Sequence, residues 1–170
     1  NMTELVVKPK PITKENFMLL LIGSIGTLNI FFSLSIFIDV MFTHLDNLKR
    51  KIYVIVGDGE CYEGSIWESI MFASHHQLDN LCIIVDRNNQ ITLDFTEDCN
   101  ALDPIDEKFS SFGLNIFKTP GHDHEQILNT FKKINIKKNS KPNLIIANTT
   151  KGKGVSFMES NLKWHHGLPN

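Results

Sequence analysis

The chain alternates between short apolar runs and helical patterns, and this alternation restricts its fold more than any other feature. Two runs rich in β-branched residues, 52–56 and 81–85, each end in a polar turn and have the length of buried strands. Between them, residues 64–76 carry apolar side chains at helical spacing. Further strands are expected at 114–118 and 143–148, with helices at 104–112 and 123–134, the latter capped by His122 or Asp123. Strands that alternate with helices predict an α/β fold with a parallel sheet and helices on both faces.

The length of 170 residues suits one compact domain with one hydrophobic core. Residues 1–15 are polar and contain two prolines, so we expect an irregular N-terminal arm followed by a single domain over 16–170. Residues 16–38 carry no charge, and such a run is either a buried helix after a glycine turn or a membrane span, which needs about 20 residues. The small polar residues that interrupt the run favour the buried helix.

Composition excludes several classes of function. The net charge is −2, which gives no basic footprint for nucleic acid. The three cysteines, Cys61, Cys82 and Cys99, are odd in number and lack a CxxC spacing, which argues against a disulfide framework and against a zinc site. We therefore expect a reducing, cytoplasmic location and cysteines that act as small apolar side chains.

Polar residues follow three of the predicted strands, at the edge where parallel sheets bind ligands, and they are Asp58, Asn88 and Lys151. Asp58 is flanked by Gly57 and Gly59, which let the backbone approach a phosphate, and its carboxylate suits Mg²⁺. A Gly-Asp-Gly turn by itself is more often only a turn. Asn88 lies thirty positions further on, after the next strand, and would add a neutral oxygen, with the backbone carbonyl of Gln90 as a third ligand.

This spacing of Gly-Asp-Gly and Asn resembles the diphosphate-binding signature of thiamine-diphosphate enzymes. Residues 57–68, 73–81 and 151–159 and the pair Trp164-His165 resemble transketolases, especially those whose N-terminal half is a separate subunit. The resemblance extends from Ile52 to the end of the chain. It implies a thiamine-diphosphate-binding fold with thiamine diphosphate and Mg²⁺ as cofactors.

The resemblance also implies roles for individual residues. Asp58 and Asn88 match the side-chain Mg²⁺ ligands, and Gln90 matches the position that offers its carbonyl. Residues that match the cofactor-binding positions are Gly57, Asp58, Gly59, Glu60, Asn88, Gln90 and Lys151.

Two residues match catalytic positions of the family. Glu63 matches an acid at the subunit contact near the cofactor, and His165 matches a histidine that faces cofactor and substrate. The neighbouring His166 leaves this last assignment open, although the family arrangement Trp-His favours His165.

The activity that the resemblance implies is transfer of a two-carbon ketol unit from a ketose phosphate to an aldose phosphate. In this family the glutamate that activates the cofactor belongs to a pyrimidine-binding domain, which we expect on a C-terminal partner subunit. The chain is then expected to work as a homo- or hetero-oligomer and to be inactive alone. The family's N-terminal half usually begins further upstream. Gly23 to Gly26 resembles the end of its glycine-rich loop, so the chain is expected to be shortened at its start.

Two alternatives remain at this stage. One is a degenerate, non-catalytic transketolase-like protein, which the altered N-terminal region favours. The other is a different thiamine-diphosphate enzyme, such as a deoxyxylulose-phosphate synthase or a 2-oxoacid dehydrogenase subunit. The stretches 75–81 and 151–154 argue against this second alternative.

Overall fold

The computed structural model describes residues 20–22, 51–136 and 139–167. Its five strands form one sheet in the order β1-β2-β3-β5-β4, and every neighbouring pair runs parallel. The strands are β1 (Leu20–Ile22), β2 (Ile52–Gly57), β3 (Leu81–Arg87), β4 (Asn115–Pro120) and β5 (Asn143–Asn148). The predicted α/β fold with a parallel sheet is confirmed.

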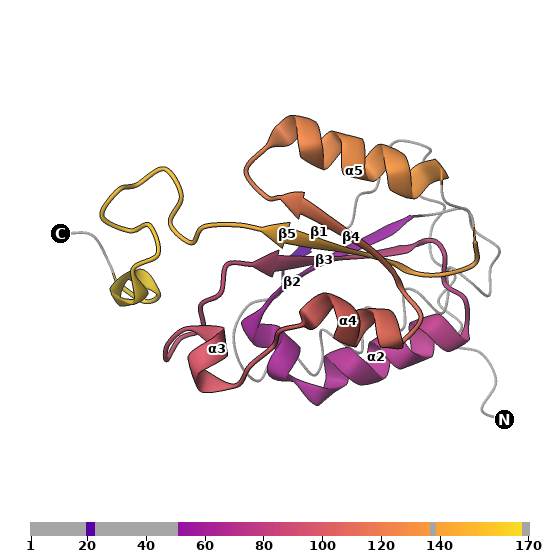
Figure 1. The fold of residues 1–170 in the computed structure, drawn as a ribbon, viewed down its shortest axis with the longest axis horizontal. Helices are drawn as coiled ribbons and strands as arrows, with labels where there is room; N and C mark the ends of the chain where they lie inside the picture. The colour runs from indigo at the N-terminus through magenta and orange to yellow at the C-terminus, as the bar shows by residue number, and fades with distance from the viewer. Residues whose placement is uncertain (1–19, 23–50, 137–138, 168–170) are drawn as a thin grey trace, which may run out of the picture.

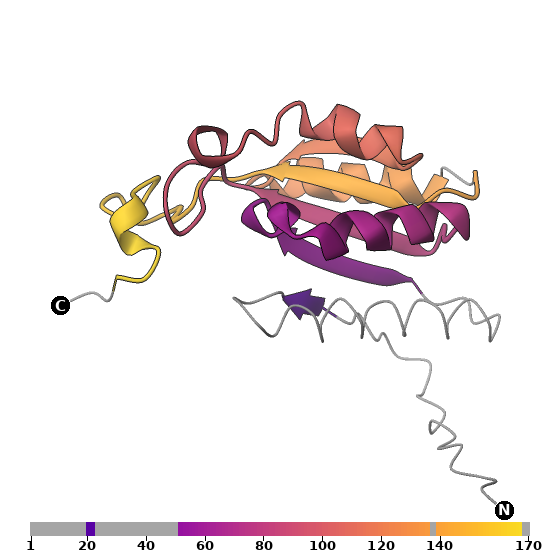
Figure 2. The same ribbon diagram turned by 90° about the horizontal axis from the view of Figure 1, so that it is seen from below.

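Helices cover both faces of this sheet, as predicted. Among the described residues the helices are α2 (Gly64–His75), α3 (Thr96–Cys99), α4 (Ile105–Ser111) and α5 (His124–Ile136), with short 3₁₀ turns η2 (Gly59–Tyr62) and η3 (Leu162–Trp164). Helices α2 and α4 lie on one face, and α5 lies on the other (Figures 1 and 2). The segment after β5 extends beyond the carboxyl ends of the strands.

The main core lies between the sheet and the pair α2 and α4. Alternate residues of the strands point to this face, because side chains alternate along a strand. Phe109 of α4 is fully buried there, and its ring stacks on Trp67 of α2 with centroids 4.8 Å apart. The strand residues of this core include Val54, Val56, Ile83, Val85, Leu144 and Ile146.

A smaller core lies under α5, on the opposite face. Cys82 and Ile145 of the sheet pack there with Ile134, and Phe131 and Tyr53 meet edge to face. All three cysteines are free, and Cys61 and Cys82 are buried. Burial raises the pKa of both these thiols to about 12, so they behave as the apolar side chains that the sequence predicted.

Three residues of the uncharged N-terminal stretch are described, and they form strand β1. Leu20–Ile22 pairs with β2, with Leu21 opposite Val54. For these residues, the helix or membrane segment predicted from the sequence was wrong. A short apolar run has the same pattern in a buried strand and in a buried helix, so periodicity does not separate them. The rest of that stretch and the expected arm at 1–15 lie outside the described residues. Within the part of the chain that is described, no helix is long and apolar enough to cross a membrane.

The start of α5 is fixed by Asp123 and not by His122. The Asp123 carboxylate accepts hydrogen bonds from the backbone N–H of Gln126 at 3.0 Å and from its side-chain amide at 2.8 Å. These two bonds, the backbone one first, lower the pKa of Asp123 from its ordinary value of 3.8. The ionised carboxylate is therefore a helix cap that stabilises the folded chain.

We expect Asp123→Ala to lower the midpoint of urea unfolding at neutral pH and to have little effect in acid. Because the pKa is lower in the folded chain, the stabilisation is present above the unfolded value and is lost as the pH falls through the folded value. Circular dichroism at both pH values measures it, with Glu125→Ala in the same helical turn as the matched control. An equal loss at both pH values would show that the charge of Asp123 is not what stabilises α5.

Candidate functional site

The carboxyl ends of β2, β3 and β5 meet at one edge of the sheet. In the strand register Gly57 lies opposite Asp86, and Asp86 lies opposite Ala147. The turns that follow these strands are therefore neighbours, and they carry Asp58, Asn88 and Lys151. The structure thus brings together the three segments in which the sequence predicted a ligand site.

Asp58 connects the turn after β2 to the turn after β3. Its side chain is 1% exposed. Its Oδ1 accepts a hydrogen bond from Gly59 N at 2.9 Å, and its Oδ2 accepts one from Asn89 N at 2.6 Å. Burial raises the pKa of Asp58, although the Asn89 and Gly59 N–H groups and the Arg87 guanidinium favour the ionised form. The bond to Asn89 holds the turn of Asn88 beside Asp58, as the spacing predicted.

Asn88 and Gln90 form a tight turn beside this carboxylate. The Asn88 Oδ1 accepts a hydrogen bond from Gln90 N at 3.0 Å, and the Asn88 amide donates to Asp86 at 3.4 Å. Gln90 is buried, and its Oε1 has no hydrogen-bond partner among the described residues. The turn therefore presents amide and carbonyl oxygens next to a carboxylate.

This set of oxygens fits Mg²⁺, which prefers a carboxylate with neutral oxygen ligands and water. Oδ1 of Asp58 accepts one hydrogen bond and so keeps a lone pair for a cation. The described residues contain no cluster of three or more His, Cys, Asp or Glu side chains that could hold a metal. A site here would depend on Asp58, Asn88 and the Gln90 carbonyl, and their coordination of Mg²⁺ stays a prediction.

Close packing and hydrogen bonds shape the turn after β2. A Cβ on Gly59 would meet the side chain of Ile91 at 2.7 Å. The Glu60 carboxylate accepts a hydrogen bond from Gly57 N at 2.6 Å, so it closes the turn from within. The N–H groups of Gly57 and Gly59 thus both donate to side chains of the turn, and the approach of this backbone to a diphosphate stays a prediction.

Arg87 belongs to this site, and reasoning from the sequence missed it. Its side chain is 4% exposed, and one guanidinium nitrogen lies 3.2 Å from Asp58 Oδ2 and 2.7 Å from Thr96 Oγ1. The other lies 2.7 Å from Glu97 and 3.4 Å from Asp103. Arg87 thereby ties the long connection after β3 to the buried carboxylate. The sequence did contain a signal for its burial, because Arg87 continues the series of alternate residues 81, 83 and 85 of β3, which face the main core.

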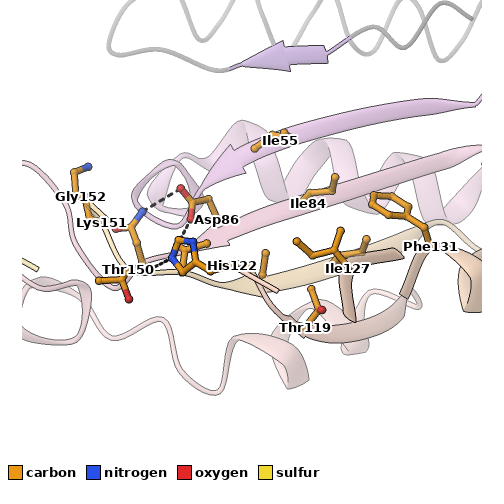
Figure 3. A pocket seen from close by; sticks show the side chains of 15 residues that line it. Ile55, Ile84, Asp86, Thr119, His122, Ile127, Phe131, Thr150, Lys151 and Gly152 are labelled. Carbon is orange, nitrogen blue, oxygen red and sulfur yellow. Dashed lines mark hydrogen bonds between the residues drawn. The ribbon is translucent and has the colours of Figure 1, made fainter. Parts of the chain in front are cut away.

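A cavity of about 470 Å³ lies beside the site, between the sheet and α5 (Figure 3). Lys151 and Asn88 line its polar end together with Asp86 and His122. Apolar side chains line the rest: Ile55, Ile84, Ile127, Phe131, Ile145 and Ala147. Lys151 therefore lies at the same edge of the sheet as Asn88. Its expected place near the reactive end of the cofactor stays a prediction.

His165 lies close enough to Lys151 for the charge of the lysine to affect the pKa of the imidazole. Burial lowers the pKa of His165, and the charges of Lys151 and His166 lower it further. Its Nε2 is 3.2 Å from the Thr92 hydroxyl, whereas its Nδ1 is buried and has no partner among the described residues. His166 is exposed. These surroundings favour the neutral form of the His165 ring, which lies beside Thr92 of the connection after β3.

Glu63 stands apart from these residues. It lies at the start of α2, is exposed, and its side chain caps no N–H group of that helix. An exposed carboxylate at this position is available to another chain, and its role at a subunit contact stays a prediction.

We expect Arg87→Met to destabilise the chain by about 3 kcal/mol, because it leaves the buried Asp58 carboxylate without its counter-charge. Chemical unfolding measures the loss. Lys118→Met is the matched control, since the pair of Lys118 and Asp106 is largely exposed and solvent screens it. Equal losses in the two variants would show that the Arg87 pair does no more than a surface ion pair.

Known proteins resemble this chain over most of its length. Residues 41–169 match the family model described as transketolase, thiamine diphosphate binding domain. The chain is 46% identical over 121 residues to an apulose-4-phosphate transketolase subunit of Actinobacillus succinogenes, covering 71% of this chain and 43% of that protein. It is 43% identical over 129 residues to the protein of the same name from Phocaeicola vulgatus, covering 76% of this chain and 46% of the relative.

A solved structure shows the same likeness. The crystal structure of transketolase from Campylobacter jejuni superposes with a TM-score of 0.62 at 34% identity, covering 67% of this chain and 18% of that one. The chain thus spans less than half the length of the relatives it matches. The resemblance drawn from the motifs is confirmed, and the chain belongs to the transketolase family, in which it represents the thiamine diphosphate binding domain.

Proposed function

We propose that this chain is the N-terminal subunit of a split transketolase that binds thiamine diphosphate through Mg²⁺. Together with a C-terminal, pyrimidine-binding partner it would transfer a two-carbon ketol unit from a ketose phosphate to an aldose phosphate. One observation carries the proposal: the hydrogen bond from Asn89 N to Asp58, which sets the two expected metal-binding turns side by side. The relatives that are named as single subunits of a transketolase support the division into two chains.

The residues of the site divide into two groups in this proposal. Asp58, Asn88 and the Gln90 carbonyl hold the cation, and the backbone of Gly57 to Glu60 approaches the diphosphate. When bound, thiamine diphosphate supplies the carbanion stabilisation that the cleavage of a ketose requires. Lys151, which lines the cavity, contacts the cofactor, and His165 accepts or donates a proton at a substrate hydroxyl.

The remaining expectations belong to the same proposal. Residues 16–170 form one domain, Glu63 contributes at the contact with the partner, and the active form is an oligomer. The free thiols of the three cysteines agree with a cytoplasmic location. Charge repulsion from Arg87 favours a second candidate, a non-catalytic family member, because the guanidinium lies 3.2 Å from the carboxylate that would bind the cation.

We expect Asp58→Asn to abolish Mg²⁺-dependent binding of thiamine diphosphate to the complex with the partner subunit. The amide keeps the shape and one acceptor oxygen of the side chain but loses the charge that a hard cation requires. Calorimetric titration measures it, with the exposed Asp79→Asn as the control. An unchanged affinity would remove Asp58 from the site.

The same titration on the unmodified complex separates the two candidates. Binding, followed by formation of glyceraldehyde 3-phosphate from xylulose 5-phosphate and ribose 5-phosphate, would support the enzymatic role. If the folded complex binds no cofactor, the non-catalytic protein is favoured.

We also expect Lys151→Met to raise the pKa of His165, because the variant removes a positive charge that disfavours the imidazolium. Titration of the imidazole resonances by NMR measures the shift. Lys163→Met, which alters an exposed lysine nearer in sequence, is the control. If Lys163→Met shifted the pKa of His165 and Lys151→Met did not, the charge of Lys151 would have no effect on this imidazole.

A further inference from the structure

His122 has a place in the structure that its sequence context does not indicate. It lies in the turn between β4 and α5, where the sequence offered it as a possible helix cap. Asp123 makes the capping bonds. His122 therefore has no part in starting α5, and its ring lines the cavity beside Lys151 (Figure 3).

The ring of His122 holds the segment that follows β5. Its Nε2 accepts a hydrogen bond from Thr150 N at 2.7 Å. The preceding residue reinforces this contact, because Gly121 N donates to Asn148 O at 2.7 Å. A Cβ on Gly121 would collide with Thr149, so only glycine allows the two segments to approach so closely. The turn before α5 and residues 148–150 thus form one unit.

The other side of the same segment is held by the end of β3. Thr149 N donates to Arg87 O at 3.1 Å, and the Thr149 hydroxyl donates to the Asp86 carboxylate. Beyond the segment, Ser160 N donates to the carbonyl of Lys151 at 2.9 Å. The backbone before Lys151 is therefore held between β3 on one side and His122 on the other.

From this geometry we propose that His122 is a positioning residue that fixes Lys151 beside the diphosphate site. The proposal rests on the proposed function, in which Lys151 contacts the cofactor. His122 acts on Lys151 through its hydrogen bond with Thr150 N. The role requires a ring nitrogen with a free lone pair at the Nε2 position, because a backbone N–H needs an acceptor there.

Two substitutions separate this role from simple space filling. His122→Phe keeps a ring but removes the acceptor, whereas His122→Gln places an amide oxygen close to the former Nε2. His124→Phe alters an exposed histidine two residues further on and is the matched control. We expect only His122→Phe to free the Thr150 amide.

The first readout is spectroscopic and needs no cofactor. A coupling across the hydrogen bond between the ¹⁵N nuclei of Thr150 and His122 Nε2 is expected in the unmodified chain and in His124→Phe. In His122→Phe the Thr150 amide should exchange faster with solvent, and His122→Gln should restore its protection. Absence of the coupling, with unchanged exchange in His122→Phe, would overturn the proposal.

The second readout is the affinity of the complex with its partner for thiamine diphosphate and for inorganic diphosphate, each with Mg²⁺. We expect His122→Phe to weaken both roughly threefold to tenfold, the range of one ordinary hydrogen bond, and His122→Gln to recover most of the loss. If His122 acts through Lys151, the loss should disappear in a Lys151→Met background. An equal loss in that background, or no loss with Lys151 present, would overturn the positioning role.

Failure of the proposed function gives a different pattern. In that case the unmodified complex binds neither ligand, or Asp58→Asn binds both as well as the unmodified complex does. The spectroscopic readout would still decide whether His122 holds the segment before Lys151.

Discussion

The carboxylate of Asp58 is the point on which the candidate site depends. It is buried at the edge of the sheet, where an unpaired charge would be costly, so its partners have little freedom to move. These partners are the N–H groups of Gly59 and Asn89 and the guanidinium of Arg87. Each belongs to a segment that the site needs in place, and the carboxylate thereby fixes the turn after β2 against the turn after β3.

Arg87 extends this network of contacts from Asp58 to the connection after β3. It joins Asp58 to Thr96 and Glu97, which lie on the connection between β3 and α4. Burial is the largest single influence on Glu97 and disfavours its charge, but the hydrogen bonds from Arg87, Leu102 N and Asp103 N together outweigh it and lower the pKa of that carboxyl. This charged network holds the connection between β3 and α4 in place, although the connection contains no long helix or strand.

Much of this fold could be predicted from the sequence, because its core strands are apolar runs that end in polar turns. The predicted strands at 52–56 and 81–85 are β2 and β3, which continue to Gly57 and Arg87. Strand β1 was missed, because a short apolar run carries no signal that separates strand from helix. The position of the site could also be predicted, because the carboxyl ends of parallel strands lie at the same edge of a sheet. The bond between His122 and Thr150 could not be predicted, because it depends on β5 lying between β3 and β4.

Because of the sheet order, the site forms only when strands that are far apart in the sequence have paired. Asp58 and Asn89 are 31 residues apart, and Thr149 and Asp86 are 63 residues apart, yet each pair is joined by a hydrogen bond. None of the three turns can offer these groups to a ligand until β2, β3 and β5 have paired. The unfolded chain therefore has no comparable affinity for a ligand of this edge. By linkage, such a ligand would raise the free energy of unfolding with each increase in its concentration, and would stabilise strands that it never touches.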